Sequence, residues 1–344
     1  MAKVSVLMSV HNGEAYLREA VDSVLAQTFD DFEFIIVDDA STDGTARILD
    51  RYDDPRIVRL SNESNLGLTR SLNRGLERAE CVYVARHDDD DISFPERLAR
   101  QVSILDNDPG AVLVAGNTEI IDADGNTLAR SRRDCDPDLV GWYLMFHNHI
   151  AGHGQVMFRA DVARRLGGYR EDMTCSQDHE FWLRMIEAGR IVIANEVFLK
   201  SRVHDAGVSR MRADEQERLS LTTSQEAIRR HGGPDLNMDK VRRLRCFWSG
   251  DFRALEGPRE LHRLLRRIAG SLGKARAGRK QRRAVGRQFL RWAGKTSLRR
   301  EFGPHVRLTV YAFRWAPAAT IRHWLWDVWA VRMGGGNRRE GAIS

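Results

Sequence analysis

Four short apolar runs, separated by segments with helical periodicity, constrain the fold of this chain more than any other feature. The runs are Val4–Val10, Phe32–Val37, Ile57–Leu60 and Cys81–Ala85. Between them, apolar residues recur at the spacing of amphipathic helices, as in Ala15–Leu25. Strands that alternate with helices predict parallel strands joined by right-handed crossovers. We therefore predict an α/β fold.

Polar residues follow three of these predicted strands, in the segments His11–Gly13, Asp38–Ser41 and His87–Asp91. In sheets of parallel strands, the ligand binds outside the carboxyl ends of the strands. We therefore expect the three segments to converge on one crevice.

The third segment carries four consecutive acids, Asp88–Asp91. Adjacent carboxylates repel one another unless a positive charge lies among them, and hard divalent cations prefer oxygen ligands. A solvated acidic turn is the alternative interpretation of such a charge run. The expected convergence with two other polar segments favours a cation site.

The chain changes in charge along its length. Residues 1–209 hold 23 Lys and Arg against 36 Asp and Glu, a net charge of −13, and residues 210–344 hold 31 against 12, a net charge of +19. Apolar residues at 261, 264, 265 and 268 follow helical spacing in the second part. We predict an α/β domain over 1–209 and a mainly helical, basic region over 210–344.

The composition, 42% hydrophobic and 30% charged, is that of a globular protein without a run of 18 apolar residues. The N-terminus leads straight into a predicted strand and lacks the pattern of a signal peptide. The cysteines, Cys81, Cys135, Cys175 and Cys246, show no zinc-like spacing. We therefore expect free thiols in a reducing cytoplasm.

Several ordered motifs within residues 3–209 resemble the inverting family 2 glycosyltransferases, which have the GT-A fold. They are Val4–Gly13, Ser23–Phe29, Ile36–Gly44, Asn65–Leu68, Ala85–Ile92 and Pro95–Leu98. Their order and spacing make the resemblance specific, although no single motif would suffice. The resemblance implies a Rossmann-like, mixed and mainly parallel sheet flanked by helices. Processive members carry membrane spans and a Gln-x-x-Arg-Trp motif; we expect neither in this chain, which implies a non-processive enzyme.

The resemblance implies that residues after the first two strands bind the nucleotide. Asp39 would hydrogen-bond the base, and Ser9 and His11 would flank it. Helix capping is the alternative for Asp39, but Ser41 or Thr42 suits that role equally well.

The acidic run matches the family's Asp-x-Asp motif, with Asp88 and Asp90 as its two acids. We assign Asp90 to a Mn²⁺ or Mg²⁺ ion and Asp88 to the ribose, the ion or its bound water. Asp89 stands where relatives commonly have a small residue, and we count it among the residues that would bind the donor. Which two of these acids act on the donor and the ion therefore stays open. The ion would neutralise charge that develops on the leaving diphosphate.

The segment Gln177–Glu180 resembles the family's acidic pair before a Trp-Leu-Arg helix. Gln177 replaces the first acid, whereas Asp178 keeps the second and is implied to be the base that takes the acceptor's hydroxyl proton. A helix N-terminal acid is the alternative for Asp178, and Glu180 is the second candidate for the base. His204, at the end of the last predicted strand, is a candidate metal ligand, although a lone His is more often structural.

Three interpretations compete for the basic region 210–344. It could neutralise nucleic-acid phosphates, dock on an anionic membrane surface, or pack on the catalytic domain as a helical extension. Tryptophans favour the membrane because they prefer its interface; they are Trp315, Trp324, Trp326 and Trp329.

Together these features predict an enzyme that moves a sugar from a UDP- or dTDP-sugar to a hydroxyl of a glycan or lipid-linked acceptor, with inversion. We expect it to serve polysaccharide or cell-envelope synthesis, in the cytoplasm or peripherally on the inner face of the cell membrane. A nucleotidyltransferase of related fold is an alternative, but it usually needs a Gly-rich, basic loop where this chain has His11–Glu14. A nucleic-acid-binding protein is another, but it leaves the acidic crevice unexplained.

Overall fold

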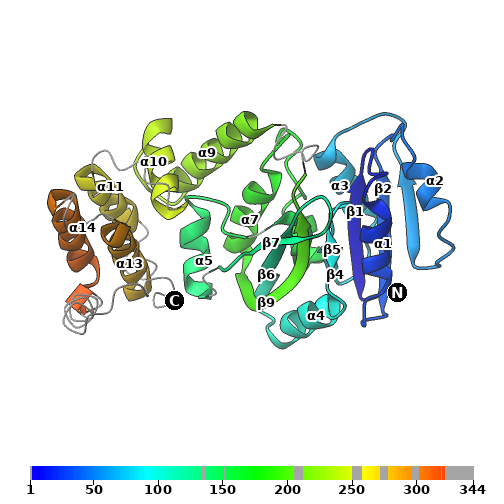
Figure 1. Cartoon of the computed structure of the whole chain (residues 1–344), viewed down its shortest axis with the longest axis horizontal. Coiled ribbons are helices and arrows are strands. Elements are labelled where there is room, and N and C mark those ends of the chain that lie inside the picture. The colour runs from blue at the N-terminus through cyan, green and yellow to red at the C-terminus, as the bar shows by residue number, and fades with distance from the viewer. Residues whose placement is uncertain are drawn as a thin grey trace. The chain divides into compact units, whose positions relative to one another are not determined.

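The computed structural model describes residues 2–133, 136–150, 152–204, 212–249, 258–271, 278–295, 302–318 and 320–321. The chain forms two compact units that divide after Ser224 (Figure 1). The boundary predicted after residue 209 lies outside the described residues, and the division falls inside the helix that follows. What each region does remains a prediction.

The first four strands pair in parallel with one another, as predicted. They lie in the order β3-β2-β1-β4, with β1 (Val4–Val10), β2 (Phe32–Asp38), β3 (Ile57–Ser61) and β4 (Tyr83–Arg86). The connecting helices are α1 (Leu17–Leu25), α2 (Thr45–Leu49) and α3 (Leu68–Arg78). Because the chain crosses over by a helix each time, the carboxyl ends of β2, β1 and β4 lie at one edge.

The remaining strands make the sheet mixed. Strand β8 (Met157–Arg159) is antiparallel to β4 and to β6 (Ala111–Ile121), and β9 (Arg190–Arg202) is parallel to β6. The short strands β5 (Ile92–Ser93) and β7 (Thr127–Arg130) pair antiparallel with β9 and β6. A tight turn joins β6 to β7, in which the Asp122 amide donates to the Asn126 carbonyl at 2.9 Å.

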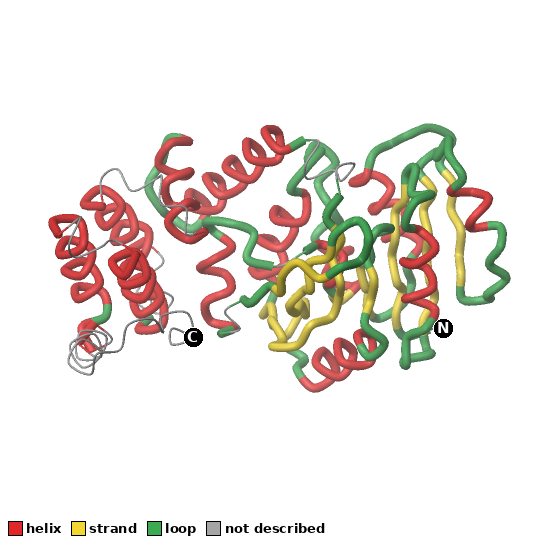
Figure 2. The backbone as a smooth tube through the Cα atoms, viewed as in Figure 1, coloured by secondary structure: helices red, strands yellow, loops and turns green. Residues whose placement is uncertain are grey.

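The helices of this half are α4 (Arg97–Asn107), α5 (Pro137–Leu144), the 3-10 turn η1 (His153–Gln155), α6 (Ala160–Arg165) and α7 (Gln177–Ala188). Figure 2 shows the strands confined to the first unit, while the described part of the second unit is helical, as predicted.

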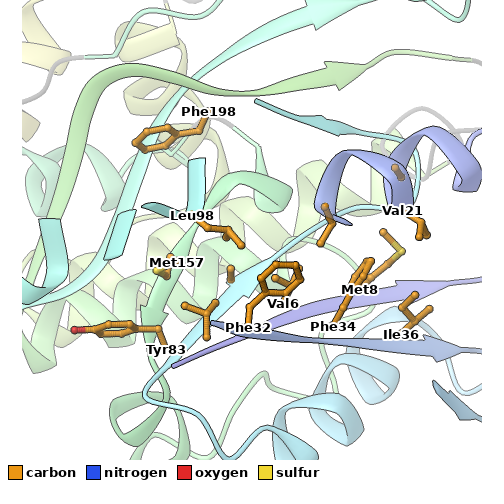
Figure 3. Close-up of a cluster of buried hydrophobic side chains, with 14 of the residues drawn as sticks. Val6, Met8, Val21, Phe32, Phe34, Ile36, Tyr83, Leu98, Met157 and Phe198 are labelled. Atoms are coloured by element: carbon orange, nitrogen blue, oxygen red, sulfur yellow. The ribbon is translucent and has the colours of Figure 1, made fainter. Parts of the chain in front are cut away.

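The core explains why the strands hold their places. Every residue of β1 is buried, as expected of a parallel strand covered on both faces. Met8 of β1, Phe34 of β2 and Val21 of α1 belong to one buried cluster (Figure 3). The strand ends are therefore fixed by packing, and the polar segments that follow them inherit that rigidity.

The second unit contains the end of α9 (Ala213–Arg230), then α10 (Met238–Ser249), α11 (Pro258–Ser271), α13 (Arg279–Lys295) and α14 (Phe302–Trp315). The apolar spacing predicted in α11 is confirmed, since Leu261, Leu264, Leu265 and Ile268 are buried. Across the described residues, we find no helix whose length and apolar character would let it span a bilayer.

The expectation that the chain lacks a Gln-x-x-Arg-Trp motif is wrong. Residues 288–292 read Gln-Phe-Leu-Arg-Trp and lie in α13. The buried side chains of Gln288 and Trp292 both donate to the carbonyl of Phe247 in α10, at 2.5 and 3.1 Å. These contacts give the two residues a packing role between helices of the second unit.

Some predictions fall partly or wholly outside the described residues. Cys81, Cys175 and Cys246 are free thiols as predicted, whereas Cys135 lies outside. So do Trp324, Trp326 and Trp329 of the predicted interfacial segment.

Candidate functional site

The three polar segments converge at the carboxyl ends of β2, β1 and β4, as predicted. The ring Nδ1 of His11 lies 2.8 Å from the Asp39 carbonyl oxygen. A Cβ added to Gly13 would lie 2.6 Å from Oδ2 of Asp89. The loop after β1 therefore touches both the loop after β2 and the acidic run after β4.

The backbone is strained at the edges of this site. Within the described residues, the non-glycine residues with positive φ are Asn12, Ala40 and Ser176, with φ of 56°, 56° and 55°. Asn12 and Ala40 directly follow the predicted site residues His11 and Asp39, and Ser176 lies two residues before Asp178. Such conformations cost about 1–3 kcal/mol each and persist where surrounding contacts over-determine them.

The loop after β1 is held by bonds from the loop after β2. The Asn12 amide donates to Ser41 Oγ at 3.0 Å, the Gly13 amide to Thr45 Oγ1 at 2.9 Å, and the Glu14 amide to Asp43 Oδ2 at 3.0 Å. Three successive amides are thus already committed within the protein.

Asp39 is 2% exposed, and its carboxylate accepts three hydrogen bonds. Oδ1 accepts from Asn62 Nδ2 at 2.6 Å and from the Leu66 amide at 2.8 Å, while Oδ2 accepts from the Gly67 amide at 2.8 Å. Gly67 precedes α3 with φ of 85°. Asp39 therefore fixes the loop that leads into α3. A contact with a nucleotide base stays a prediction, and it requires the Leu66 and Gly67 amides to share or release this carboxylate.

Three of the four acids in the run have distinct partners. Arg86 Nη2 donates to Asp88 Oδ1 at 2.5 Å, and His204 Nε2 lies 2.9 Å from Asp90 Oδ2. The Arg202 amide donates to Asp91 Oδ1 at 2.9 Å. The structure thus brings His204 to Asp90, the two residues predicted to share a metal.

The acids also raise one another's pKa. Burial, followed by the charges of Asp90 and Asp88, raises the pKa of Asp89 to about 8. Burial and Asp88 likewise raise the pKa of Asp90, which His204 partly offsets. A carboxylate that resists ionisation beside two others is the electrostatic signature of a place that a cation would stabilise.

These residues fit a divalent cation shared with a diphosphate. In the described part of the chain, no group of three or more His, Cys, Asp or Glu side chains is placed so that it could hold a metal ion by itself. Mg²⁺ bound with a substrate phosphate usually takes only one or two protein carboxylates and keeps several waters. Asp88 and Asp90 provide that number of hard oxygen donors.

Asp178 begins α7 and is held by a neighbouring loop. Asn148 Nδ2 donates to Asp178 Oδ2 at 2.7 Å. Burial raises the pKa of Asp178; the His179 amide and Asn148 oppose that shift, and the charge of Asp88 adds to it. The carboxylates of Asp88 and Asp178 therefore act on one another, although 89 positions of sequence separate them.

Other predicted residues have structural partners. Glu180 is buried and accepts bonds from Arg184 through both oxygens, at 2.7 to 3.0 Å. Arg202 donates to the carbonyls of Asp90 and Ala123 and pairs with Glu19. Neither side chain is free for the chemistry considered.

Ser9 is buried near the end of β1, and Gln177 is buried at the start of α7. His153 Nε2 lies 2.9 Å from the Tyr169 hydroxyl. Burial and the charge of Arg86 lower the pKa of His153 well below its ordinary value.

Three residues of the site were not assigned a role from sequence. Arg86 is 1% exposed beneath Asp88, and Asn148 holds Asp178. Gly154 leaves room for the acids, because a Cβ there would lie 2.6 Å from Asp88 Oδ2 and 2.9 Å from Asp91 Oδ2. Arg86 lies next to the acidic run in the sequence, so a basic side chain that balances these acids could have been expected there. The positions of Asn148 and Gly154 depend on how distant loops fold.

Comparisons with known proteins agree with this geometry. The profile of Glycosyl transferase family 2 matches residues 5–167. EpsE of Bacillus subtilis (strain 168), by name a glycosyltransferase, is 38% identical over 192 residues, which cover 54% of this chain and 68% of EpsE. An uncharacterised glycosyltransferase of Methanocaldococcus jannaschii is 33% identical over 205 residues, covering 58% of this chain and 70% of the relative.

Solved structures share the fold. The 1–349 fragment of S. aureus TarS, in complex with UDP-GlcNAc, superposes with a TM-score of 0.57 at 18% identity, over 91% of each chain. A mannosyltransferase from Pyrobaculum calidifontis, in complex with GDP-Man and Mn²⁺, gives 0.53 at 19% identity, over 94% of this chain and 83% of the other. The GT-A fold predicted for this chain is therefore confirmed.

Proposed function

Since the chain belongs to glycosyl transferase family 2, we propose that it transfers a sugar from a nucleotide-sugar to an acceptor hydroxyl with inversion, assisted by a divalent cation. The donor we propose is a UDP- or dTDP-sugar. The acceptor is a glycan or a lipid-linked glycan precursor, made for the cell envelope at the inner face of the membrane.

The observation that carries this proposal is the convergence of the polar loops at one edge of the sheet, where His11 contacts the Asp39 carbonyl, Gly13 lies against Asp89, and His204 contacts Asp90. Inverting transfer needs a base on one face of the sugar and a stabilised leaving group on the other. We assign the first role to Asp178, at the head of α7, and the second to Asp88 and Asp90, after β4. The turn η1 lies against both elements, because Gly154 abuts Asp88 and the His153 ring packs on Trp182 of α7.

Each residue then has one task. Asp178 accepts the proton of the acceptor hydroxyl, and Asn148 keeps its carboxylate oriented. Asp90 and Asp88 would hold Mn²⁺ or Mg²⁺ against the diphosphate, with His204 beside Asp90. When bound, the ion supplies positive charge for the departing diphosphate. Ser9, His11 and Asp39 would lie against the base of the nucleotide.

A nucleotidyltransferase fits the same loop less well. Such an enzyme would use backbone amides and basic side chains after the first strand to hold the triphosphate. In this chain the backbone amides of this loop already donate hydrogen bonds within the protein: Asn12 to Ser41, Gly13 to Thr45 and Glu14 to Asp43. The loop also carries no Lys or Arg between His11 and Glu14.

A panel of nucleotide-sugars tests the proposal. The panel includes UDP-, dTDP- and GDP-sugars, among them UDP-GlcNAc and GDP-Man, each with Mn²⁺, Mg²⁺ or EDTA. We expect metal-dependent thermal stabilisation and slow donor hydrolysis with one donor. Asp90→Ala should abolish both effects. If no nucleotide-sugar binds the wild type, or if Asp90→Ala changes nothing, the proposed donor site is wrong.

A further inference from the structure

Helix α14 has apolar side chains on two opposite faces. Its inner face is buried through Leu308, Ala312 and Trp315, and the Trp315 indole donates to His262 Nδ1 of α11 at 2.9 Å. A helix on the surface of a globular protein normally carries polar residues on its outer side. The outer side of α14 instead exposes Val306, Val310 and Phe313 by 39%, 45% and 49%.

These exposed residues form a continuous stripe, which we call the α14 stripe. Positions 306, 310 and 313 recur at the spacing of one helix face, and Ile321, beyond the end of α14, is also 48% exposed. Arg307 and Arg314 are exposed along one flank of the stripe. In the described part of the first unit, large exposed apolar residues such as Val82 and Leu128 occur singly on separate elements, which needs no explanation.

The helix packed against α14 is strongly basic. Gly286 of α13 lies so close to α14 that a Cβ there would be 2.5 Å from the Cβ of Ala316, and the two helices are neighbours in Figure 1. Helix α13 contains no Asp or Glu, and its basic residues are Arg279, Lys280, Arg282, Arg283, Arg287, Arg291 and Lys295. Of these, Arg279, Arg282 and Arg283 are exposed, so positive charge is presented to solvent by the helix that packs against α14.

We propose that the helical unit docks on an anionic lipid bilayer through the α14 stripe. The apolar side chains would enter the boundary between headgroups and acyl chains, while the arginines of α13 and α14 meet the anionic headgroups. The surface combines apolar and basic side chains, and a nucleic-acid backbone would satisfy only the basic ones. The inference extends the lipid-linked acceptor of the proposed function, but the surface itself does not depend on the chemistry of the first unit.

Vesicle flotation of the full chain tests this. The vesicles contain phosphatidylcholine alone or with ~30% phosphatidylglycerol. We expect binding only to the anionic vesicles, weakened as NaCl rises from ~0.05 to ~0.5 M. The double variant Val310→Ser/Phe313→Ser should bind at least ~10-fold more weakly, because it removes apolar area from the interface. The matched control Val82→Ser/Leu128→Ser removes exposed apolar residues from the first unit and should bind like the wild type.

A gain-of-binding variant guards against misfolding of the double variant. Val310→Trp should bind anionic vesicles more tightly, because Trp prefers the interface. The inference is overturned if the wild type ignores anionic vesicles, if the stripe and control variants bind alike, or if the stripe variants alter self-association or RNA binding but not vesicle binding. Donor hydrolysis measured without vesicles separates the two proposals: hydrolysis without vesicle binding would overturn only this one.

Discussion

The side-chain amide of Asn148 donates a hydrogen bond of 2.7 Å to Oδ2 of Asp178, at the first turn of α7. The bond joins the loop after α5 to the residue that we propose as the base. It fixes the direction of the carboxylate and favours its ionised form, against the burial that raises its pKa. A base that must be ionised to accept a proton depends on this balance.

We predict that Asn148→Ala shifts the pH dependence of transfer. Burial already raises the pKa of Asp178, and loss of the donor raises it further. A protonated Asp178 cannot act as the base, so activity is lost as the pH falls through this pKa. The acidic limb of the kcat profile should therefore move to higher pH, with kcat at neutral pH lowered ~10-fold.

The measurement is the pH profile of kcat at saturating donor. Asn107→Ala is the matched control, because Asn107 is an exposed amide that bonds within α4, and its profile should match the wild type. An Asn148→Ala enzyme that loses thermal stability but keeps the wild-type acidic limb would show that Asn148 is only structural.

Gly154→Ala should weaken donor binding without unfolding the chain. The new Cβ would lie 2.6 Å from Asp88 Oδ2 and 3.0 Å from the Asp88 amide, so the carboxylate must move. We expect a Kd for the donor–metal complex raised ~10-fold, a loss of ~1.4 kcal/mol in binding free energy. Isothermal titration measures this. Gly270→Ala, which meets no atom within 4 Å, should leave binding unchanged, and equal binding by both variants would contradict the assignment of Asp88.

Asp39→Asn distinguishes a structural role from a base contact. The carboxylate accepts hydrogen bonds from Asn62, Leu66 and Gly67. In Asn, an NH₂ group replaces one carboxylate oxygen and would face an N–H donor instead of accepting from it. We expect the free energy of unfolding of the first unit to fall by ~2 kcal/mol, and donor binding to weaken with it. Denaturant titration checks the first effect, with exposed Asp124→Asn as control. If stability is unchanged but donor binding is lost, Asp39 acts only by contacting the base of the nucleotide.

Arg86→Met should destabilise the protein more than the loss of an exposed ion pair does. The guanidinium is 1% exposed and lies 2.5 Å from Asp88, so its removal leaves Asp88 without its counter-charge beside three other acids. We expect a loss of ~2 kcal/mol in unfolding free energy, discounted because Asp88 is partly exposed. Arg165→Met, which breaks the exposed pair with Asp161, should cost at most ~1 kcal/mol. Equal losses would contradict a special role for Arg86.

The sequence was sufficient to predict the convergence of the site but not its internal contacts. Parallel strands place their carboxyl ends at one edge, so the grouping of His11, Asp39 and Asp88 followed from alternation alone. The contact of Asn148 with Asp178 could not be predicted, because it depends on the path of the loop between α5 and η1. No local pattern encodes which amide a distant helix start will meet.

Two outcomes had signals in the sequence. Glu180 and Arg184 are four residues apart on one helix, the spacing at which opposite charges pair, and they do pair. The Gln-Phe-Leu-Arg-Trp run at 288–292 was also readable, but only the fold shows that Gln288 and Trp292 bond to the Phe247 carbonyl. A motif therefore takes its meaning from the element that carries it.

The most direct test of the account is Asp178→Asn, assayed for donor binding and for sugar transfer on the same preparation. Asn keeps the shape of the side chain but cannot accept the acceptor's proton. We predict a donor Kd within ~2-fold of the wild type and a kcat at least ~100-fold lower. Retained transfer would show that another group is the base. Loss of both donor binding and transfer would show that Asp178 serves the structure of the site instead.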